Sequence, residues 1–184
     1  MRRTLALCTL VYLAGVTPAV AQVNPAATFS APQCGGPGIG TVTLTADNPP
    51  TPTLQGKFDI MLVADESGSI DGQEFQLLRN FLVNFARSFT FGDGATRMGL
   101  VMFSNEARLA TGITASQQAF VNAAANVGQL AGGTCTGCGM ALATSHLQSF
   151  KRSDAEAIII TITDGFANVF TQTIESAAAT ADAL

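Results

Sequence analysis

The sequence predicts an α/β protein with an open, doubly wound, mostly parallel sheet that helices cover on both faces. Strand-like and helix-like segments alternate after residue 57, which is typical of strands joined by crossover helices. The strand-like segments are apolar at consecutive positions, which indicates burial on both faces of a sheet. With 184 residues and 47% hydrophobic composition, the chain is long enough and apolar enough for one sizeable core.

The first 21 residues have the features of a secretory signal peptide. Arg2 and Arg3 precede an apolar stretch, and the small residues Ala19 and Ala21 fit a cleavage site at its end. Pro18 interrupts the apolar stretch, which is short of the ~20 residues that a membrane-spanning helix needs. We therefore expect a secreted protein, either extracellular or, in a bacterium, periplasmic or cell-surface, and no membrane insertion of the mature chain.

Residues 22–56 differ in composition from everything that follows. They hold six of the seven prolines and the run Gly35-Gly36-Pro37-Gly38, without helical periodicity. We expect a linker or loosely ordered arm here, and a globular domain over residues 57–184.

The charge balance is acidic, with 9 lysines and arginines against 13 aspartates and glutamates. Two of the basic residues lie in the expected signal peptide, so cleavage makes the chain more acidic. This balance disfavours nucleic acid and anionic membranes as partners.

The elements of the domain follow one another in a simple order. A strand over residues 58–64 precedes a helix for which Asp71 and Glu74 provide a capping box. The apolar residues of this helix recur at spacings of three and four: Phe75, Leu78, Leu82, Phe85 and Phe89. The remaining elements are a strand at 97–104, a weaker strand at 107–111, a helix at 116–127, a helix that opens at 132–134 and runs to 150, a strand at 155–163, and a helix at 172–184.

Oxygen-bearing side chains follow two of the expected strands. Sheets of this kind bind ligands beyond the carboxyl ends of their strands, where the strand order reverses, and both Asp65 and Asp164 follow a strand. Asp65, Ser67 and Ser69 alternate along a tight loop, so their oxygens can converge on one point. Hard divalent cations prefer oxygen ligands, and Mg²⁺ uses few carboxylates.

Three motifs together resemble the von Willebrand factor A (vWA) domain: DESGSI at 65–70, the Thr134-Cys135-Thr136-Gly137 loop before a helix, and ITDG at 162–165. The resemblance implies a metal-ion-dependent adhesion site, abbreviated MIDAS. In that site Ser67, Ser69 and Thr134 would be hydroxyl ligands, while Asp65 and Asp164 would act mainly through metal-bound water. It also implies that an Asp or Glu of the partner fills the sixth position. Mg²⁺ is the expected cation, with Mn²⁺ and Ca²⁺ as alternatives.

The same residues have structural alternatives. Ser67 and Ser69 could cap the following helix, and Asp164 could simply start a turn with Gly165. Glu66 is expected to be a solvated neighbour of the site.

Cys135 and Cys138 form a Cys-x-x-Cys pair inside the threonine loop. Because Cys8 lies in the expected signal peptide, three cysteines remain in an oxidising compartment. We hypothesise a local disulfide between Cys135 and Cys138 that clamps the loop, which a bond from either to Cys34 would contradict. Thiol redox chemistry, and a zinc site that also uses His146, are the alternatives.

The resemblance covers residues 57–184 and ends one helix past ITDG, where the family usually continues through further strands and a closing helix. The sequence therefore predicts a domain that is incomplete at its C-terminus, with residues 158–162 as an exposed apolar edge of the sheet.

We expect a secreted, non-catalytic binding or adhesion module for a protein or surface ligand that presents Asp or Glu to the metal. The alternatives are a regulatory or accessory domain of a larger secreted protein and a Mg²⁺-dependent enzyme. For an enzyme, the sequence offers no second acid two residues after Asp65 and only one histidine.

Overall fold

The computed structural model of the chain describes residues 8–13, 56–165, 167–169, 177 and 179–180. It contains one sheet with the strand order β1-β5-β2-β3-β4. The strands are β1 (Cys8–Leu13), β2 (Phe58–Asp65), β3 (Thr96–Phe103), β4 (Ala107–Thr114) and β5 (Glu156–Thr163). Strand β2 pairs in parallel with β3 and β5, and the edge strands β4 and β1 are antiparallel to their neighbours. The predicted fold class is confirmed, with an antiparallel strand at each edge.

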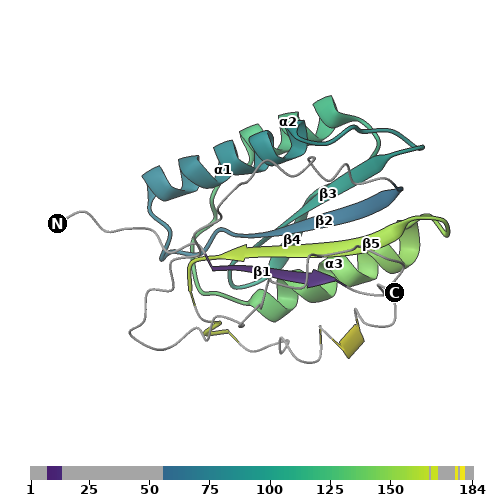
Figure 1. Cartoon of the computed structure of the whole chain (residues 1–184). Helices are drawn as coiled ribbons and strands as arrows, with labels where there is room; N and C mark the ends of the chain where they lie inside the picture. The colour runs from purple at the N-terminus through teal and green to yellow at the C-terminus, as the bar shows by residue number, and fades with distance from the viewer. Residues whose placement is uncertain (1–7, 14–55, 166, 170–176, 178, 181–184) are drawn as a thin grey trace, which may run out of the picture. The chain divides into compact units, whose positions relative to one another are not determined.

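Helices cover both faces of the sheet (Figure 1). Helices α1 (Gly72–Arg87) and α2 (Gln117–Asn126) lie on one face, and α3 (Thr136–Phe150) lies on the other. Two clusters of buried apolar side chains correspond to these two layers. No helix within the described residues is both long enough and apolar enough to cross a membrane.

Strand β2 contributes to both clusters because successive side chains of a strand point to opposite faces. Ile60 and Leu62 belong to the cluster under α1 and α2, whereas Met61 and Val63 belong to the cluster under α3. All four are at most 2% exposed. The consecutive apolar run that predicted a buried strand therefore reflects packing on two faces.

Helix α1 begins where the sequence predicts. The side chain of Asp71 accepts hydrogen bonds from the backbone of Gln73 and Glu74, and Glu74 in turn accepts from the backbone of Asp71. Since Asp71 caps the helix, Ser67 and Ser69 do not, and that alternative is wrong. The helix ends at Arg87, so Phe89 packs against the core from outside the helix.

The edges of the sheet differ from the sequence prediction. Strand β4 extends to Thr114, beyond the expected 107–111. Residues 158–162 are not an exposed edge in this chain, because β1 pairs with β5 from Thr163 to Ile158. Strand β1 lies within the expected signal peptide. Residues 22–55, including Cys34, lie outside the described residues, as does most of the expected helix at 172–184, of which Ala177, Ala179 and Thr180 are helical.

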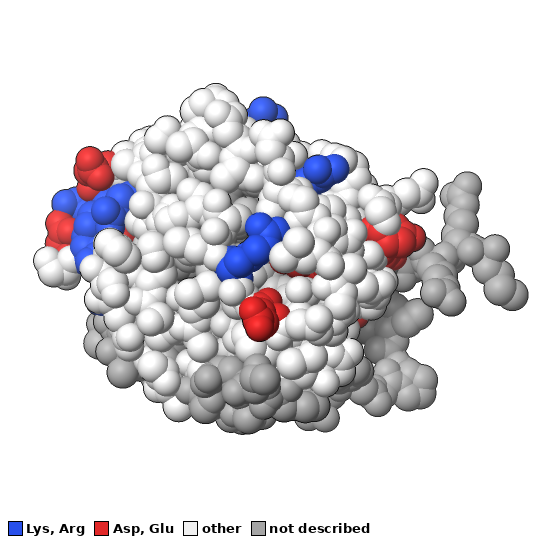
Figure 2. Space-filling model, turned by 180° about the vertical axis from the view of Figure 1, so that it is seen from behind, with Lys and Arg blue, Asp and Glu red and all other residues white. Residues whose placement is uncertain are grey.

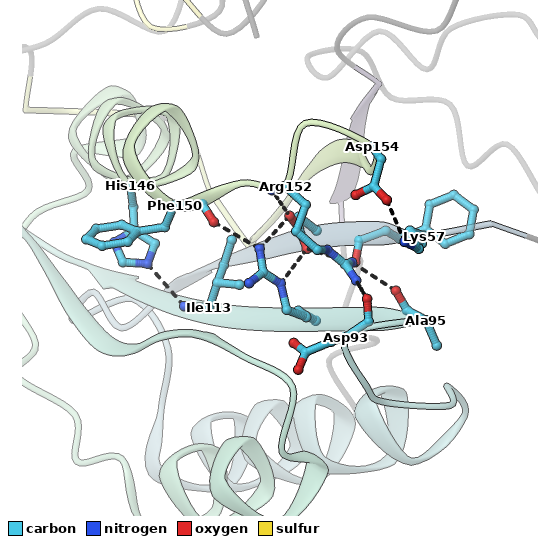
Figure 3. A network of polar contacts seen from close by, with 11 residues as sticks. Lys57, Asp93, Ala95, Ile113, His146, Phe150, Arg152 and Asp154 are labelled. Atoms are coloured by element: carbon cyan, nitrogen blue, oxygen red, sulfur yellow. Dashed lines mark hydrogen bonds and ion pairs between the residues drawn. The ribbon is translucent and has the colours of Figure 1, made fainter.

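An ionic network occupies the pole of the sheet at the amino end of β2 (Figure 3). The buried carboxylate of Asp59 accepts hydrogen bonds from Arg97 at 2.9 and 2.8 Å and from the backbone and side chain of Arg152. Arg152 also donates to the carbonyl groups of Phe58 and Ala95. Burial alone would raise the pKa of Asp59, but the hydrogen bonds from the two arginines outweigh it, so the pKa is lowered.

Candidate metal site

The site predicted from the sequence lies at the opposite pole, at the carboxyl ends of β2 and β5. Asp65 is the last residue of β2, and Asp164 directly follows β5. The two strands are neighbours, with Ala64 opposite Ile162. The chain reaches β3 on one side of β2 and β5 on the other, so this is the point where the strand order reverses.

A chain of hydrogen bonds joins four of the five predicted ligands. The backbone amide of Ser67 donates to Oδ1 of Asp65 at 2.7 Å, and the hydroxyls of Ser67 and Ser69 lie 2.9 Å apart. The hydroxyl of Ser69 donates to Oδ1 of Asp164 at 3.2 Å. Ser67 is buried and Ser69 is exposed, so the group opens to solvent on one side.

Asp65 is fully buried at the inner end of this chain. Its Oδ2 accepts a hydrogen bond of 2.6 Å from the hydroxyl of Thr163, a contact that sequence reasoning missed. Burial raises the pKa of Asp65; hydrogen bonds from Thr163 and Ser67 offset part of this effect, and the nearby Asp164 adds to it. Among the residues that the structure describes, the hydrogen-bond partners of this buried acid include no cationic side chain, so a bound cation would stabilise its charged form.

The segment that leads into the threonine loop, residues 131–133, lies against the serine loop, residues 66–70. The amide of Gly68 donates to the carbonyl of Gly132 at 2.9 Å, and a Cβ at Gly68 would lie only 3.3 Å from that carbonyl oxygen. Gly132 has φ of 103°, a conformation that favours glycine, and Ala131 before it has φ of 57°. Close approach of the two backbones therefore explains Gly68, and the positive φ explains Gly132.

Thr134, the fifth predicted ligand, is buried and held through its backbone. The amides of residues 133–135 donate to three separate acceptors. These are Oδ1 of Asn105 for Gly133, Oδ1 of Asn168 for Thr134 and the carbonyl of Ser104 for Cys135, each at 2.7 Å. The carbonyl of Thr134 accepts in return from the amide of Asn168 at 3.0 Å. The two asparagines are positioning groups with no signal in the sequence motifs.

A disulfide joins Cys135 and Cys138 at the start of α3. Cys135 is the N-cap residue of the helix and is fully buried. The bond therefore closes the turn that directly follows Thr134. It also leaves neither sulfur as a thiolate for zinc, so the structure gives no support to a zinc site built on this pair.

Glu66 is not a solvated neighbour, and that expectation is wrong. Its side chain is 1% exposed and forms a two-pronged ion pair with Arg108, at 2.9 Å to Oε1 and 2.6 Å to Oε2. A buried carboxylate requires such a partner, because an unpaired buried charge is costly. The partner lies 42 residues away on β4, which the motif could not indicate.

The donor set at this pole fits a hard divalent cation. It consists of hydroxyl groups from Ser67, Ser69 and Thr134 and of the carboxylates of Asp65 and Asp164, all oxygen donors. Among the residues that the structure describes, no three His, Cys, Asp or Glu side chains gather in a way that could hold a metal. A cation here would therefore depend on the hydroxyl groups.

Charged groups on the surface are sparse on the face seen in Figure 2. Basic and acidic groups appear there singly or in small groups between wide uncharged areas, and no basic stripe crosses this face. This surface gives no support to binding of a polyanion.

The open, mixed sheet, with carboxylate side chains at the ends of two neighbouring parallel strands, defines a class of α/β domain that comparison with known proteins names. The family model of the von Willebrand factor type A domain matches residues 59–183, and the chain belongs to this family. Human vitrin is 33% identical over 115 residues, which are 61% of this chain and 17% of vitrin. The mouse collagen alpha-4(VI) chain is 32% identical over 111 residues, 59% of this chain and 5% of the collagen chain.

A solved structure shows the same fold. Proximal thread matrix protein 1 from the mussel byssus superposes with a TM-score of 0.56 at 25% identity, over 66% of this chain and 32% of that chain. Vitrin and type VI collagen are extracellular matrix proteins. The chain spans less than a fifth of the length of either.

Proposed function

We propose that this chain is a secreted, non-catalytic binding module that holds a divalent cation at the carboxyl ends of β2 and β5. Ser67, Ser69 and Thr134 would hold the cation through their hydroxyl groups, with Asp65 and Asp164 acting mainly through water. The observation that carries the proposal is the hydrogen-bonded chain from Asp65 through the two serines to Asp164, which brings oxygen donors from distant motifs to one solvent-facing point.

The partner would be a protein or surface ligand that presents an Asp or Glu side chain. When bound, the cation supplies a positive centre with a coordination position open to a carboxylate oxygen. Because the exposed hydroxyl of Ser69 and the half-buried Asp164 border the solvent side of the site, a partner carboxylate has access there. Mg²⁺ is the proposed cation, with Mn²⁺ and Ca²⁺ as the alternatives.

Membership of the family supports a binding role rather than an enzymatic one, because the related matrix proteins are not enzymes. The described part of the chain also offers little for acid–base chemistry. Its one histidine, His146, accepts a hydrogen bond from the amide of Ile113 in β4. The alternative is a regulatory or accessory domain of a larger secreted protein; the chain spans 17% of vitrin and 5% of the collagen chain.

The test is a calorimetric titration of Mg²⁺ and Mn²⁺ into the full chain and into a variant with Asp65→Ala and Ser67→Ala. Ser149→Ala is a matched control, because Ser149 is an exposed serine of α3 that only donates to the carbonyl of Ser145. We expect saturable binding in the wild type and in the control, and none in the double variant. A folded wild type that binds neither cation would contradict the proposal.

A further inference from the structure

Glu66 lies between two of the candidate ligands but takes no part in the hydrogen bonds that join them. Asp65 and Ser67 contact one another through the backbone of Ser67, while the side chain of Glu66 turns to Arg108 on β4. The amide of Glu66 also donates to the carbonyl of Phe103 at 2.9 Å, which continues the pairing of β2 with β3 by one residue. Glu66 therefore fixes the first residue of the loop from the side away from the candidate ligands.

The two members of this ion pair differ in burial. The side chain of Glu66 is 1% exposed, whereas that of Arg108 is 36% exposed. Without Arg108, the buried carboxylate of Glu66 would lose its ion-pair partner, which favours movement of Glu66 and of the backbone between Asp65 and Ser67 toward water. The arginine also fixes the orientation of the carboxylate, because Nε of Arg108 donates to Oε1 of Glu66 and Nη2 donates to Oε2.

Two hydrogen bonds from the segment that follows α2 hold the same loop. The side-chain amide of Gln129 donates to the carbonyl of Ser67 at 3.0 Å and to that of Ile70 at 2.8 Å. Arg108 reaches the same segment, since it donates to the carbonyl of Gly128 at 2.7 Å. The 66–70 loop is thus held at one side chain and two carbonyl groups by residues that are not candidate ligands.

We propose that Arg108 and Gln129 are positioning residues of the metal site, which hold Ser67 and Ser69 in the geometry that binds the cation. This inference rests on the proposed function, because it takes from it that the bound group is a divalent cation. Arg108 has a further effect through charge. Because Arg108 pairs with Glu66, the carboxylates that the site offers to a cation are those of Asp65 and Asp164, without a third acid.

The experiment compares Arg108→Gln and Gln129→Met with wild type by titrating Mn²⁺ into the full chain. Arg87→Gln is the matched control: it removes the same charge from an exposed position at the far end of α1, about 24 Å along the 16-residue helix from its start. We expect each test variant to weaken Mn²⁺ binding about 10- to 100-fold, the effect typical of outer-shell partners. The control should bind like wild type.

Amide hydrogen exchange in the metal-free proteins separates positioning from general stability. The amides of Ser67 and Gly68 are bonded within the site, whereas that of Leu62 lies in the centre of the sheet. We expect Arg108→Gln to speed exchange at Ser67 and Gly68 and to leave Leu62 unchanged. Equal acceleration at all three would overturn the inference, because the ion pair would then stabilise the whole domain.

The two proposals fail in different ways. If the wild type binds Mn²⁺ and both test variants bind it with the same affinity, the positioning role is wrong and the proposed metal site is unaffected. If the wild type binds no Mn²⁺, the proposed function is wrong, and the exchange rates of the metal-free proteins alone decide whether Arg108 positions the loop.

Discussion

The hydroxyl of Ser69 donates a hydrogen bond to Asp164 at 3.2 Å, although 95 residues separate the two in the chain. Parallel pairing of β2 with β5 produces this contact, because it places the carboxyl ends of both strands at the same edge of the sheet. The serine loop and the Asp164 turn are short extensions of these two strands. The pairing of these two strands therefore sets the geometry of the candidate site.

Replacing Thr134 by valine removes a hydroxyl while nearly keeping the shape of a buried side chain. We expect Thr134→Val to weaken Mn²⁺ binding at least about tenfold, as the loss of even an outer-shell partner does. Thr134→Ser retains the hydroxyl and should bind nearly as well as wild type. Calorimetric titration of both variants provides the comparison, and equal affinity of the two would remove Thr134 from the ligand set.

Breaking the disulfide between Cys135 and Cys138 should loosen the turn after Thr134. For so short a loop, the restraint on the unfolded chain amounts to about 2 kcal/mol. We expect Cys135→Ser with Cys138→Ser to lower the midpoint of thermal unfolding and to weaken Mn²⁺ binding. A reducing agent should have the same effect on wild type and little effect on the double variant. Unchanged Mn²⁺ affinity of wild type after reduction would show that the disulfide does not hold the loop.

Asp59→Asn should destabilise the domain without changing the metal site. The substitution leaves Arg97 and Arg152 without a carboxylate partner, which for a buried pair costs about 3 kcal/mol or more. Asp154→Asn, which removes an exposed contact with Lys57, should have a much smaller effect. Denaturant unfolding measures both, and a change in Mn²⁺ affinity in Asp59→Asn would show that the two poles are coupled.

His146 should make the fold sensitive to mild acid. Burial lowers its pKa from 6.5, and its Nε2 accepts a hydrogen bond of 3.1 Å from Ile113, so the neutral ring is the form that fits. The unfolded chain then takes up a proton at a higher pH than the folded chain. This contribution to stability is therefore present above the ordinary histidine pKa and is lost as the pH falls from there through the lowered pKa of the folded chain.

The matching experiment follows the thermal midpoint of wild type and His146→Gln from about pH 8 to about pH 5. Glutamine retains an acceptor oxygen but does not titrate. We expect the midpoint to fall less in the variant than in wild type over this interval. Parallel curves would mean that protonation of His146 is not linked to folding.

The order of strands and helices was readable from the sequence because burial on two faces leaves a clear pattern. The consecutive apolar residues of β2 and the three-and-four spacing from Phe75 to Leu82 both reflect packing directly. Phe89 fitted that spacing but lies past the helix end, since spacing alone does not mark where the last helical hydrogen bond forms. The pairing of β1 with β5 also lies beyond a local pattern, because it joins residues about 150 positions apart.

At the site, the motifs indicated the residues that could touch a cation but not those that hold them. Glu66 looked like a solvated acid because its partner, Arg108, comes next to it only when β4 folds back antiparallel on β3. The same holds for Asn105 and Asn168, whose side chains accept from the threonine loop. Such contacts depend on tertiary structure, so short motifs do not predict them.

We propose that a cation binds among Ser67, Ser69 and Thr134, and anomalous diffraction from crystals soaked in Mn²⁺ is the most direct test. We expect an anomalous peak within bonding distance of these three hydroxyl oxygens, with Asp65 and Asp164 close by. A folded crystal without a peak there, or with its strongest peak at another part of the chain, would contradict the claim.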